Sequence, residues 1–151
     1  MLQLPTLARF LPFHALYYSF LTGRIILLRR SLLYPIGDGL VEAKEARERG
    51  NRVLASKYAQ LAKASRAHGN FAEQVPLTLL SLLCLELNGV STSRLRILHT
   101  LLLITRLFHA ELGMMGKSSY GVGRPIGVVL QMALMLGTGI YNGLLVWRGS
   151  V

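Results

Sequence analysis

The sequence predicts an all-α membrane protein, a four-transmembrane-helix bundle formed as one domain by residues 1–151. Two observations lead to this prediction. The chain is 52% apolar and only 16% charged, yet its formal net charge is +10, whereas a soluble domain carries about a quarter charged residues. The apolar residues and the cations are also segregated along the chain, which is typical of a membrane protein whose connecting loops hold its cations.

The same composition argues against other classes of protein. Disorder is excluded because the chain has too many large apolar residues to remain solvated. No nucleic-acid partner is expected, since Tyr17, Tyr18 and Phe20 lie in an apolar run and not between clustered cations. The single cysteine, Cys84, cannot form an intrachain disulfide, and we expect it to be a small buried apolar residue.

Four apolar segments are expected to cross the membrane, at about residues 11–28, 66–87, 95–112 and 125–147. The first is near the lower length limit for a crossing and contains His14 and Arg24. The second and third also contain ionisable residues, which are tolerated where they face a protein interior or a wet cavity. The fourth contains no formal charge, so its assignment follows from hydropathy alone.

The polar stretch at residues 29–65 is expected to form a basic cytoplasmic loop, with a short helix at residues 41–49. Four crossings place both termini on one side of the membrane. The first and third connections hold about ten Lys and Arg residues, against about three in the termini and the second connection. The positive-inside rule therefore predicts a multi-pass protein with both termini outside the cytoplasm.

A polar stripe enters the second segment from the cytoplasmic side. Its members follow one another at offsets of three, four and three, which share one helix face: Lys63, Arg66, Asn70 and Glu73. An interfacial ladder of ion pairs would explain Lys63 and Arg66. Because Asn70 and Glu73 lie below the interface, where polar groups are costly, the stripe is also a candidate ligand site.

The third segment places His99, Arg106 and His109 on one helix face. An arginine at this depth needs a counter-charge, and Glu73 of the second segment is the nearest by depth. Two interpretations remain open: an ion pair between Arg106 and Glu73 that holds the bundle together, or a polar cavity that both residues line.

Two further cationic positions are candidates for anion binding. Arg24 in the first segment could extend to the cytoplasmic interface or meet an anion. Before the fourth segment, Tyr120 and Arg124 lie where a helix N-terminus would favour negative charge. No metal site is expected, since His109 and Glu111, two residues apart, point to different sides of a helix.

Several cations and one or two carboxylates are thus predicted at the cytoplasmic membrane face. A small molecule with two carboxylates and one ammonium would match them, and glutathione has this composition. Its thiol would gain nucleophilicity from a neighbouring Arg or Tyr that favours the thiolate.

The second segment resembles the signature of the MAPEG family, the membrane-associated proteins of eicosanoid and glutathione metabolism. The resemblance lies in residues 66–73, which read RAHGNFAE, followed by Pro76. The turn at residues 35–39 (PIGDG) and residues 106–109 (RLFH) are similar to the small bacterial branch of that family. The resemblance covers nearly the whole chain and implies a four-helix subunit of a bacterial inner membrane, a homotrimer, and glutathione held between neighbouring subunits.

The resemblance also implies residue roles. It implies that Arg66, Asn70, Glu73 and His109 contact glutathione, and Lys63 stands where several members have arginine. One departure concerns Gly127, which lies about where the eicosanoid-synthesising members have an arginine that supports the thiolate. A tyrosine of some members is replaced by Gly113.

The sequence therefore predicts a glutathione transferase-like enzyme that conjugates glutathione to, or reduces with it, an apolar electrophile arriving through the lipid. The expected catalytic residues are Arg106, Arg124 and Tyr120, and the expected glutathione-binding residues are Arg24, Lys63, Arg66, Asn70, Glu73 and His109. The alternative is a non-catalytic protein on the same scaffold that binds an anionic lipid or a small anion. A transporter is disfavoured because the fourth segment has no ionisable residue.

Overall fold

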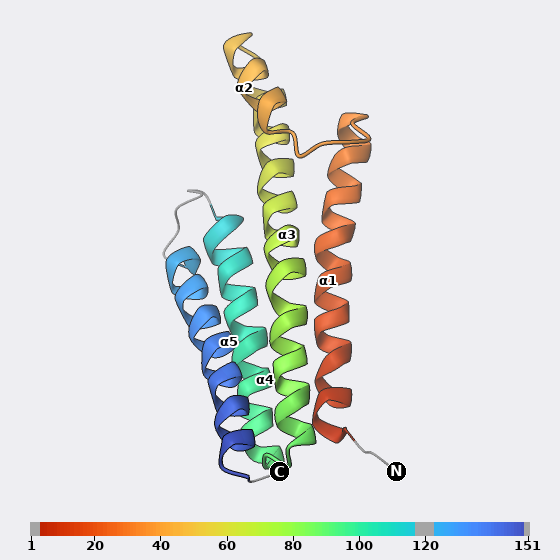
Figure 1. The fold of residues 1–151 in the computed structure, drawn as a ribbon. Helices are drawn as coiled ribbons and strands as arrows, with labels where there is room; N and C mark the ends of the chain where they lie inside the picture. The colour runs from red at the N-terminus through yellow and green to blue at the C-terminus, as the bar shows by residue number, and fades with distance from the viewer. Residues whose placement is uncertain (1–3, 117–122, 150–151) are drawn as a thin grey trace.

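The computed structural model describes residues 4–116 and 123–149, and those residues form helices and no strands (Figure 1). The elements are α1 (Pro5–Leu32), α2 (Leu40–Glu48), α3 (Arg52–Leu87), α4 (Thr92–Leu107), the π-helix η1 (Phe108–Met114) and α5 (Gly123–Trp147). The all-α prediction is confirmed.

Three stretches of helix are long and apolar enough to cross a membrane: α1, the continuous α4–η1 helix and α5. They coincide with the first, third and fourth predicted crossings, as expected for an integral membrane protein. The second predicted crossing lies in α3, whose apolar half is interrupted by Asn70, Glu73 and Gln74. These polar side chains keep its hydropathy below that of the other three helices.

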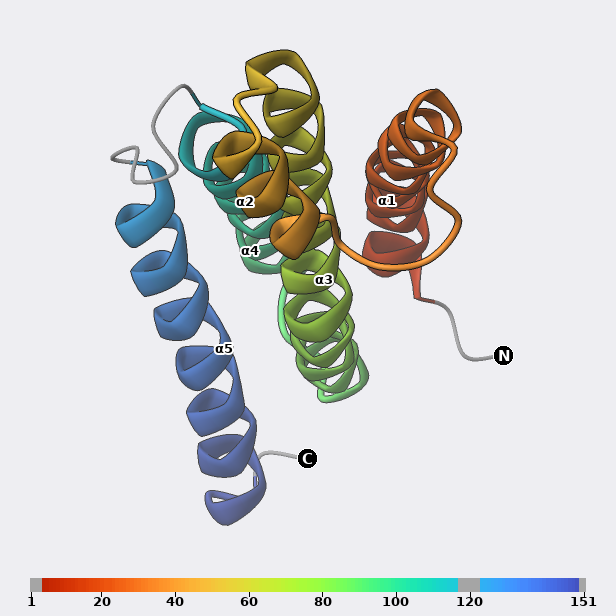
Figure 2. The ribbon, with the colours of Figure 1, turned by 90° about the horizontal axis from the view of Figure 1, so that it is seen from above.

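The long helix α3 is the centre of the bundle and contacts every other element. Figures 1 and 2 show α1 on one side of α3, with α4 and α5 on the other. The start of α1, the end of α5 and the turn between α3 and α4 lie together at one end, called here the terminal end (Figure 1). The other end, where α2 packs on α3, is called here the α2 end.

Local signals explain where the helices begin and end. Pro5 occupies the start of α1, where its missing N–H costs nothing. The carboxylate of Glu86 at the end of α3 accepts hydrogen bonds from the N–H groups of Thr6 (2.7 Å) and Leu7 (3.0 Å). It thereby satisfies unpaired donors at the α1 N-terminus. Asn51 caps α3 by accepting from the Leu54 N–H at 3.1 Å.

The predicted loop at residues 29–65 is largely helical. The expected helix at residues 41–49 is observed as α2, one residue earlier at each end. The expected second crossing begins near residue 66, but α3 begins at Arg52 and is 36 residues long. Because α2 packs against this first part of α3, tertiary contact stabilises helix in a segment too polar to belong to the membrane.

The interior of the bundle is apolar between α1, α3 and α4, with Leu21, Leu82 and Leu102 among its fully buried residues. Between α3 and α5 it is polar. We call the side chains there the α3–α5 polar ladder, which consists of Thr78, Ser81, Asn88, Gln131, Thr138 and Asn142. Interhelical hydrogen bonds of this kind join helices in lipid, where apolar contact alone provides little driving force.

Cys84 is exposed, and the expectation that it is buried was wrong. Its neighbours Leu82 and Leu85 occupy the buried positions on this part of α3. In a membrane helix the lipid-facing side chains are as apolar as the core, so the apolar surroundings of Cys84 in the sequence did not reveal which face it occupies.

Candidate functional site

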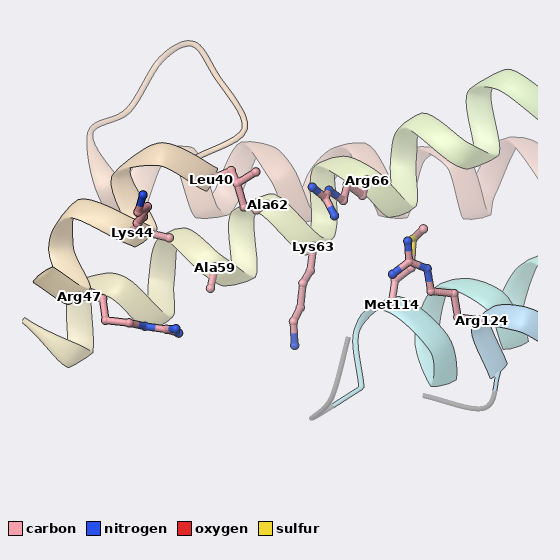
Figure 3. Close-up of a pocket in the computed structure, with 10 residues that line it drawn as sticks. Leu40, Lys44, Arg47, Ala59, Ala62, Lys63, Arg66, Met114 and Arg124 are labelled. Carbon is pink, nitrogen blue, oxygen red and sulfur yellow. The ribbon is translucent and has the colours of Figure 1, made fainter. Parts of the chain in front are cut away.

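A cavity of about 260 Å³ lies at the α2 end, between α2, α3 and the junction of η1 with α5 (Figure 3). We call it the cationic cavity, because five of its lining residues are basic: Lys44, Arg47, Lys63, Arg66 and Arg124. The described residues that line it include no Asp or Glu, and the remainder are apolar, among them Leu40, Ala62 and Met114.

Helical spacing brings these cations together. Lys44 and Arg47 lie three residues apart on α2, and Lys63 and Arg66 lie three residues apart on α3, so each pair shares a helix face. Arg124 comes from the first turn of α5, across from α3 (Figure 3). The Lys63 ammonium donates to the Gly116 carbonyl at 2.9 Å, which joins α3 to the end of η1.

The connection between α1 and α2 is held in place by two side chains. Arg29 donates to the Gly37 carbonyl at 2.8 Å, and the Tyr34 hydroxyl donates to Glu42 of α2 at 2.6 Å. This hydrogen bond to a carboxylate raises the pKa of Tyr34 to about 12, because the negative charge of Glu42 opposes ionisation of the phenol. The two contacts position α2, and therefore Lys44 and Arg47, beside α3.

The concentration of like charge is the main electrostatic feature of this cavity. Lys44 has an ion pair with Glu48 at 3.9 Å, but both side chains are exposed and the pair is weak. Carboxylates bind arginine and lysine through short, charge-assisted hydrogen bonds. The cavity is therefore suited to a small molecule with more than one negative group and an apolar portion.

The structure brings three of the predicted site residues, Lys63, Arg66 and Arg124, to one cavity. It does not bring the rest of the predicted stripe there. Asn70 donates to the Arg66 carbonyl of its own helix at 3.1 Å, and Glu73 is exposed on the outer face of α3.

Arg106 is buried, with 2% of its surface exposed, and does not line the cationic cavity. It donates to the Gln74 side-chain oxygen at 3.1 Å and to the Gly127 carbonyl at 2.9 Å. The possible ion pair with Glu73 is not formed. Consecutive helical residues point about 100° apart, from the 3.6-residue turn, so Gln74 faces the interior while Glu73 faces outward.

His99, Arg106 and His109, predicted to share one face, are all buried. They contact different helices, because His99 stacks on Phe10 of α1 whereas Arg106 bonds to the Gly127 carbonyl of α5. The His109 Nδ1 lies 3.1 Å from the Arg124 carbonyl. His109 therefore contacts the backbone of Arg124, and the His109 side chain does not line the cationic cavity.

Arg24 forms an ion pair that the sequence analysis missed. Its guanidinium lies 2.9 Å and 3.1 Å from the two carboxylate oxygens of Glu111 in η1, and the Tyr17 hydroxyl donates to the same carboxylate at 3.0 Å. Arg24 thus ties α1 to η1 and does not line the cationic cavity. Residues 24 and 111 are too distant in sequence for helical periodicity to relate them.

The departures from the family pattern at Gly113 and Gly127 have a steric reason. A Cβ atom at Gly127 would lie 2.5 Å from the Cβ of His109, and one at Gly113 would lie 2.6 Å from the Arg124 backbone nitrogen. The wide turns of the π-helix η1 pack directly against α5. An arginine at position 127 or a tyrosine at position 113 would not fit this packing.

Two residues that line the cationic cavity were not predicted from the sequence, and one expected catalytic residue has no described position. Lys44 and Arg47 were assigned only to the basic loop, although their spacing beside Leu40 and Ala43 is the signal of an amphipathic helix face. Tyr120, an expected catalytic residue, lies outside the described residues. Among the residues that are described, no three His, Cys, Asp or Glu side chains gather as metal ligands.

Comparison with known proteins adds one finding to this geometry. The sequence model that describes the MAPEG family matches residues 7–144 of this chain. These residues include nearly all of α1 through α5 and every lining residue of the cationic cavity. No curated protein and no solved structure gives a significant match. The resemblance noted in residues 66–73 therefore extends over nearly the whole chain.

Proposed function

Because the chain belongs to the MAPEG family, we propose that it is a membrane-bound glutathione transferase-like protein. It binds glutathione at the cytosolic membrane face and conjugates it to, or reduces with it, an apolar electrophile. The cationic cavity is the observation that carries this proposal, because five basic side chains line it without an acidic one among the described residues.

The charges of glutathione match this cavity. Its two carboxylates would meet Arg66 and Lys63 on α3, with Lys44 and Arg47 supplying further positive potential from α2. Arg124, on the opposite wall, would favour the thiolate over the thiol. Arg124 is a better candidate for this role than Arg106, which lies below the cavity and is already bonded to Gln74 and Gly127.

Conjugation requires no further catalytic group from the protein once the thiolate is formed. The thiol proton passes to solvent, and the sulfur lone pair forms a bond to the electrophilic carbon while the leaving group departs with its bonding electrons. The apolar part of the cavity wall, including Leu40 and Met114, would contact an electrophile that arrives through the lipid.

The proposal includes a membrane arrangement. The apolar half of α3 would supply a fourth crossing, since α3 runs between three helices that are themselves long and apolar enough to cross. The cationic cavity would then face the cytosol, and the terminal end would lie outside the cytoplasm, in a bacterial inner membrane. Placing the basic α2 end inside agrees with the positive-inside rule.

A homotrimer would account for Glu73. This carboxylate is exposed on the part of α3 that is proposed to lie in the membrane, where an unsheltered charge is costly. In a trimer it would face a neighbouring subunit and meet the ammonium of glutathione bound there.

Two measurements on protein purified in detergent test the proposal. Glutathione is titrated calorimetrically, and conjugation is then assayed with 1-chloro-2,4-dinitrobenzene as a generic electrophile. Binding followed by turnover is expected. Absence of binding at millimolar glutathione would contradict the proposal, and binding without turnover would limit it to glutathione recognition.

The alternative is a non-catalytic protein on the same scaffold that binds an anionic lipid or a small anion. It is favoured by the mixed lining of the cavity, where cations alternate with apolar residues such as Leu40 and Ala62, as a lipid headgroup and its chains would require. Tight binding of phosphatidylglycerol, together with no binding of glutathione, would select this alternative.

A further inference from the structure

Polar side chains join α1 to η1, although the backbones of these two elements do not approach each other closely. Figure 2 shows α3 between them. The Glu111 carboxylate of η1 accepts hydrogen bonds from the Arg24 guanidinium at 2.9 Å and 3.1 Å and from the Tyr17 hydroxyl at 3.0 Å. The Arg24 guanidinium also lies 4.5 Å from the centre of the Phe20 ring, in a cation–π contact. Side chains of α1 therefore hold this carboxylate in one place.

Stability alone does not account for an ion pair at this position. Arg24 and Glu111 lie in helices that are long and apolar enough to cross a membrane, where ionisable side chains are costly. Replacing a buried ion pair by well-packed apolar residues often leaves stability unchanged or raises it. Polar contacts between helices can instead fix the relative position of the elements that they join. The groups that η1 holds are therefore the ones that this pair affects.

The side of η1 opposite Glu111 holds the backbone of Arg124. The His109 Nδ1 lies 3.1 Å from the Arg124 carbonyl oxygen. A Cβ atom at Gly113 would lie 2.6 Å from the Arg124 backbone nitrogen, so η1 and the start of α5 pack backbone against backbone. Residues 109 and 113 are about one turn apart, and residue 111 is about half a turn from each. The π-helix is thus held by α1 on one side and packs on α5 on the other.

The end of η1 also supports Lys63. Met114, the last residue of η1, lines the cationic cavity and is buried. The carbonyl of Gly116, two residues later, accepts a hydrogen bond from the Lys63 ammonium at 2.9 Å. Two cations of the cavity, one from α3 and one from α5, therefore depend on η1 for their placement.

We propose that Arg24 and Glu111 are positioning residues for the cationic cavity. Their ion pair fixes η1 relative to α1, and η1 in turn fixes Lys63 and Arg124. Neither member of the pair lines the cavity, so the pair acts through η1. This inference rests on the proposed function, in which Lys63 meets a carboxylate of glutathione and Arg124 favours the thiolate.

The paired variant Arg24→Met/Glu111→Leu tests this proposal. It exchanges the ion pair for apolar side chains and leaves the net charge of the protein unchanged, so the overall attraction of an anion is not altered. The matched control is Glu45→Gln/Arg49→Gln, which removes an exposed ion pair of 3.2 Å on α2, also without a change in net charge. Neither residue of the control pair lines the cationic cavity.

Two measurements on the full chain in detergent do not depend on glutathione. Thermal unfolding of the apolar pair is expected to match that of the wild type. Hydrogen–deuterium exchange of the peptide that contains residues 108–116 is expected to be about tenfold faster, because η1 opens more easily without its contact to α1. The control pair should leave both quantities unchanged.

Two further measurements report on the cavity. In calorimetric titration the apolar pair should bind glutathione about tenfold more weakly, the effect of one misplaced charge-assisted hydrogen bond. The ultraviolet absorbance of the bound thiolate should appear about one pH unit higher than in the wild type, because a displaced Arg124 no longer favours ionisation of the thiol. A purely structural ion pair would not shift this pH.

Unchanged exchange of residues 108–116 in the apolar pair would overturn the proposal. Faster exchange with wild-type affinity and wild-type thiolate formation would also overturn it, since η1 would then not place the cations of the cavity. A lower unfolding temperature that accompanies the loss of affinity would assign the pair to stability instead. Absence of glutathione binding by the wild type would contradict the proposed function, whereas wild-type binding that the apolar pair retains in full would contradict this inference alone.

Discussion

The cationic cavity and the α3–α5 polar ladder both place polar side chains of α3 in an otherwise apolar bundle, but they differ in how these groups are paired. In the ladder, polar side chains bond to one another across the helix interface. Asn142, for example, donates to the Ser81 carbonyl at 2.9 Å and accepts from Asn88 at 3.2 Å. The cationic cavity instead gathers five side chains of the same sign, with no acidic side chain among its described lining residues.

The polar side chains of α3 therefore have two different roles along the helix. Mutual hydrogen bonds between helices satisfy their own groups and therefore contribute to stability. A cluster of like charges repels itself, and a bound anion relieves this repulsion. We therefore expect substitutions in the ladder to change stability, and substitutions in the cavity to change ligand affinity.

The largest stability effect is expected at the junction of the two regions, in Gly127→Ala. The added Cβ would lie 2.5 Å from the Cβ of His109, and overpacking of this kind costs about 1–3 kcal/mol. Thermal unfolding in detergent, followed by circular dichroism, measures the effect. Gly137→Ala is the matched control on the same helix, since nothing lies within 4 Å of its added Cβ. Equal unfolding temperatures for the two variants would show that η1 and α5 are not closely packed.

Within the ladder, Asn142→Leu is expected to lower stability by about 1–2 kcal/mol, because it removes hydrogen bonds to α3. Its glutathione affinity is expected to equal that of the wild type. The two quantities are measured by thermal unfolding and by calorimetry. A reduced affinity with unchanged stability would contradict the assignment of the ladder to the fold.

In the cavity the opposite pattern is expected. Arg66→Gln removes a charged partner of a glutathione carboxylate and should weaken calorimetric binding about tenfold, or about 1.4 kcal/mol, without changing the unfolding temperature. Arg94→Gln is the matched control, since Arg94 is exposed in the first turn of α4 at the terminal end. The same loss in both variants would indicate a general effect of net charge and not a site.

A smaller effect is expected for Glu73→Gln, which should weaken glutathione binding about threefold, as expected for an exposed charge contact. Arg94→Gln should cause no such loss. Calorimetric titrations of the two variants against the wild type decide the question. Equal effects would mean that Glu73 has a structural role and does not meet the ligand.

The smallest effect concerns the contact that positions α2. The pKa of Tyr34 is raised to about 12 by its hydrogen bond to Glu42, above the unperturbed value of about 10. Its stabilising contribution is therefore complete below about pH 10 and is lost as the pH rises through about 12. The absorbance titration of the wild type minus that of Tyr34→Phe should show one tyrosinate forming near pH 12. Formation near pH 10 would contradict the contact.

The sequence revealed relations within a helix better than relations between helices. Lys63 and Arg66 could be placed on one face from their spacing, and both line the cationic cavity. The partners of Arg106 and Arg24 could not be predicted, because Gln74 and Glu111 lie on other helices and the packing of η1 decides which side chains meet.

The contribution of α2 was missed for a related reason. Its cations were counted as loop charges that orient the protein, and only the docking of α2 on α3 shows that Lys44 and Arg47 line the cavity. The burial of Cys84 was predicted wrongly because hydropathy does not distinguish core from lipid. In each case the missing information was tertiary contact.

The central claim is that the cationic cavity recognises the negative charges of glutathione. It is tested most directly by calorimetric titration of the wild-type protein with glutathione and with its diethyl ester, in which both carboxylates are neutralised. We predict that glutathione binds and that the ester binds at least about tenfold more weakly, the effect of losing one charge-assisted hydrogen bond or more. Equal affinities for the two compounds, or no binding of glutathione at millimolar concentration, would contradict this claim.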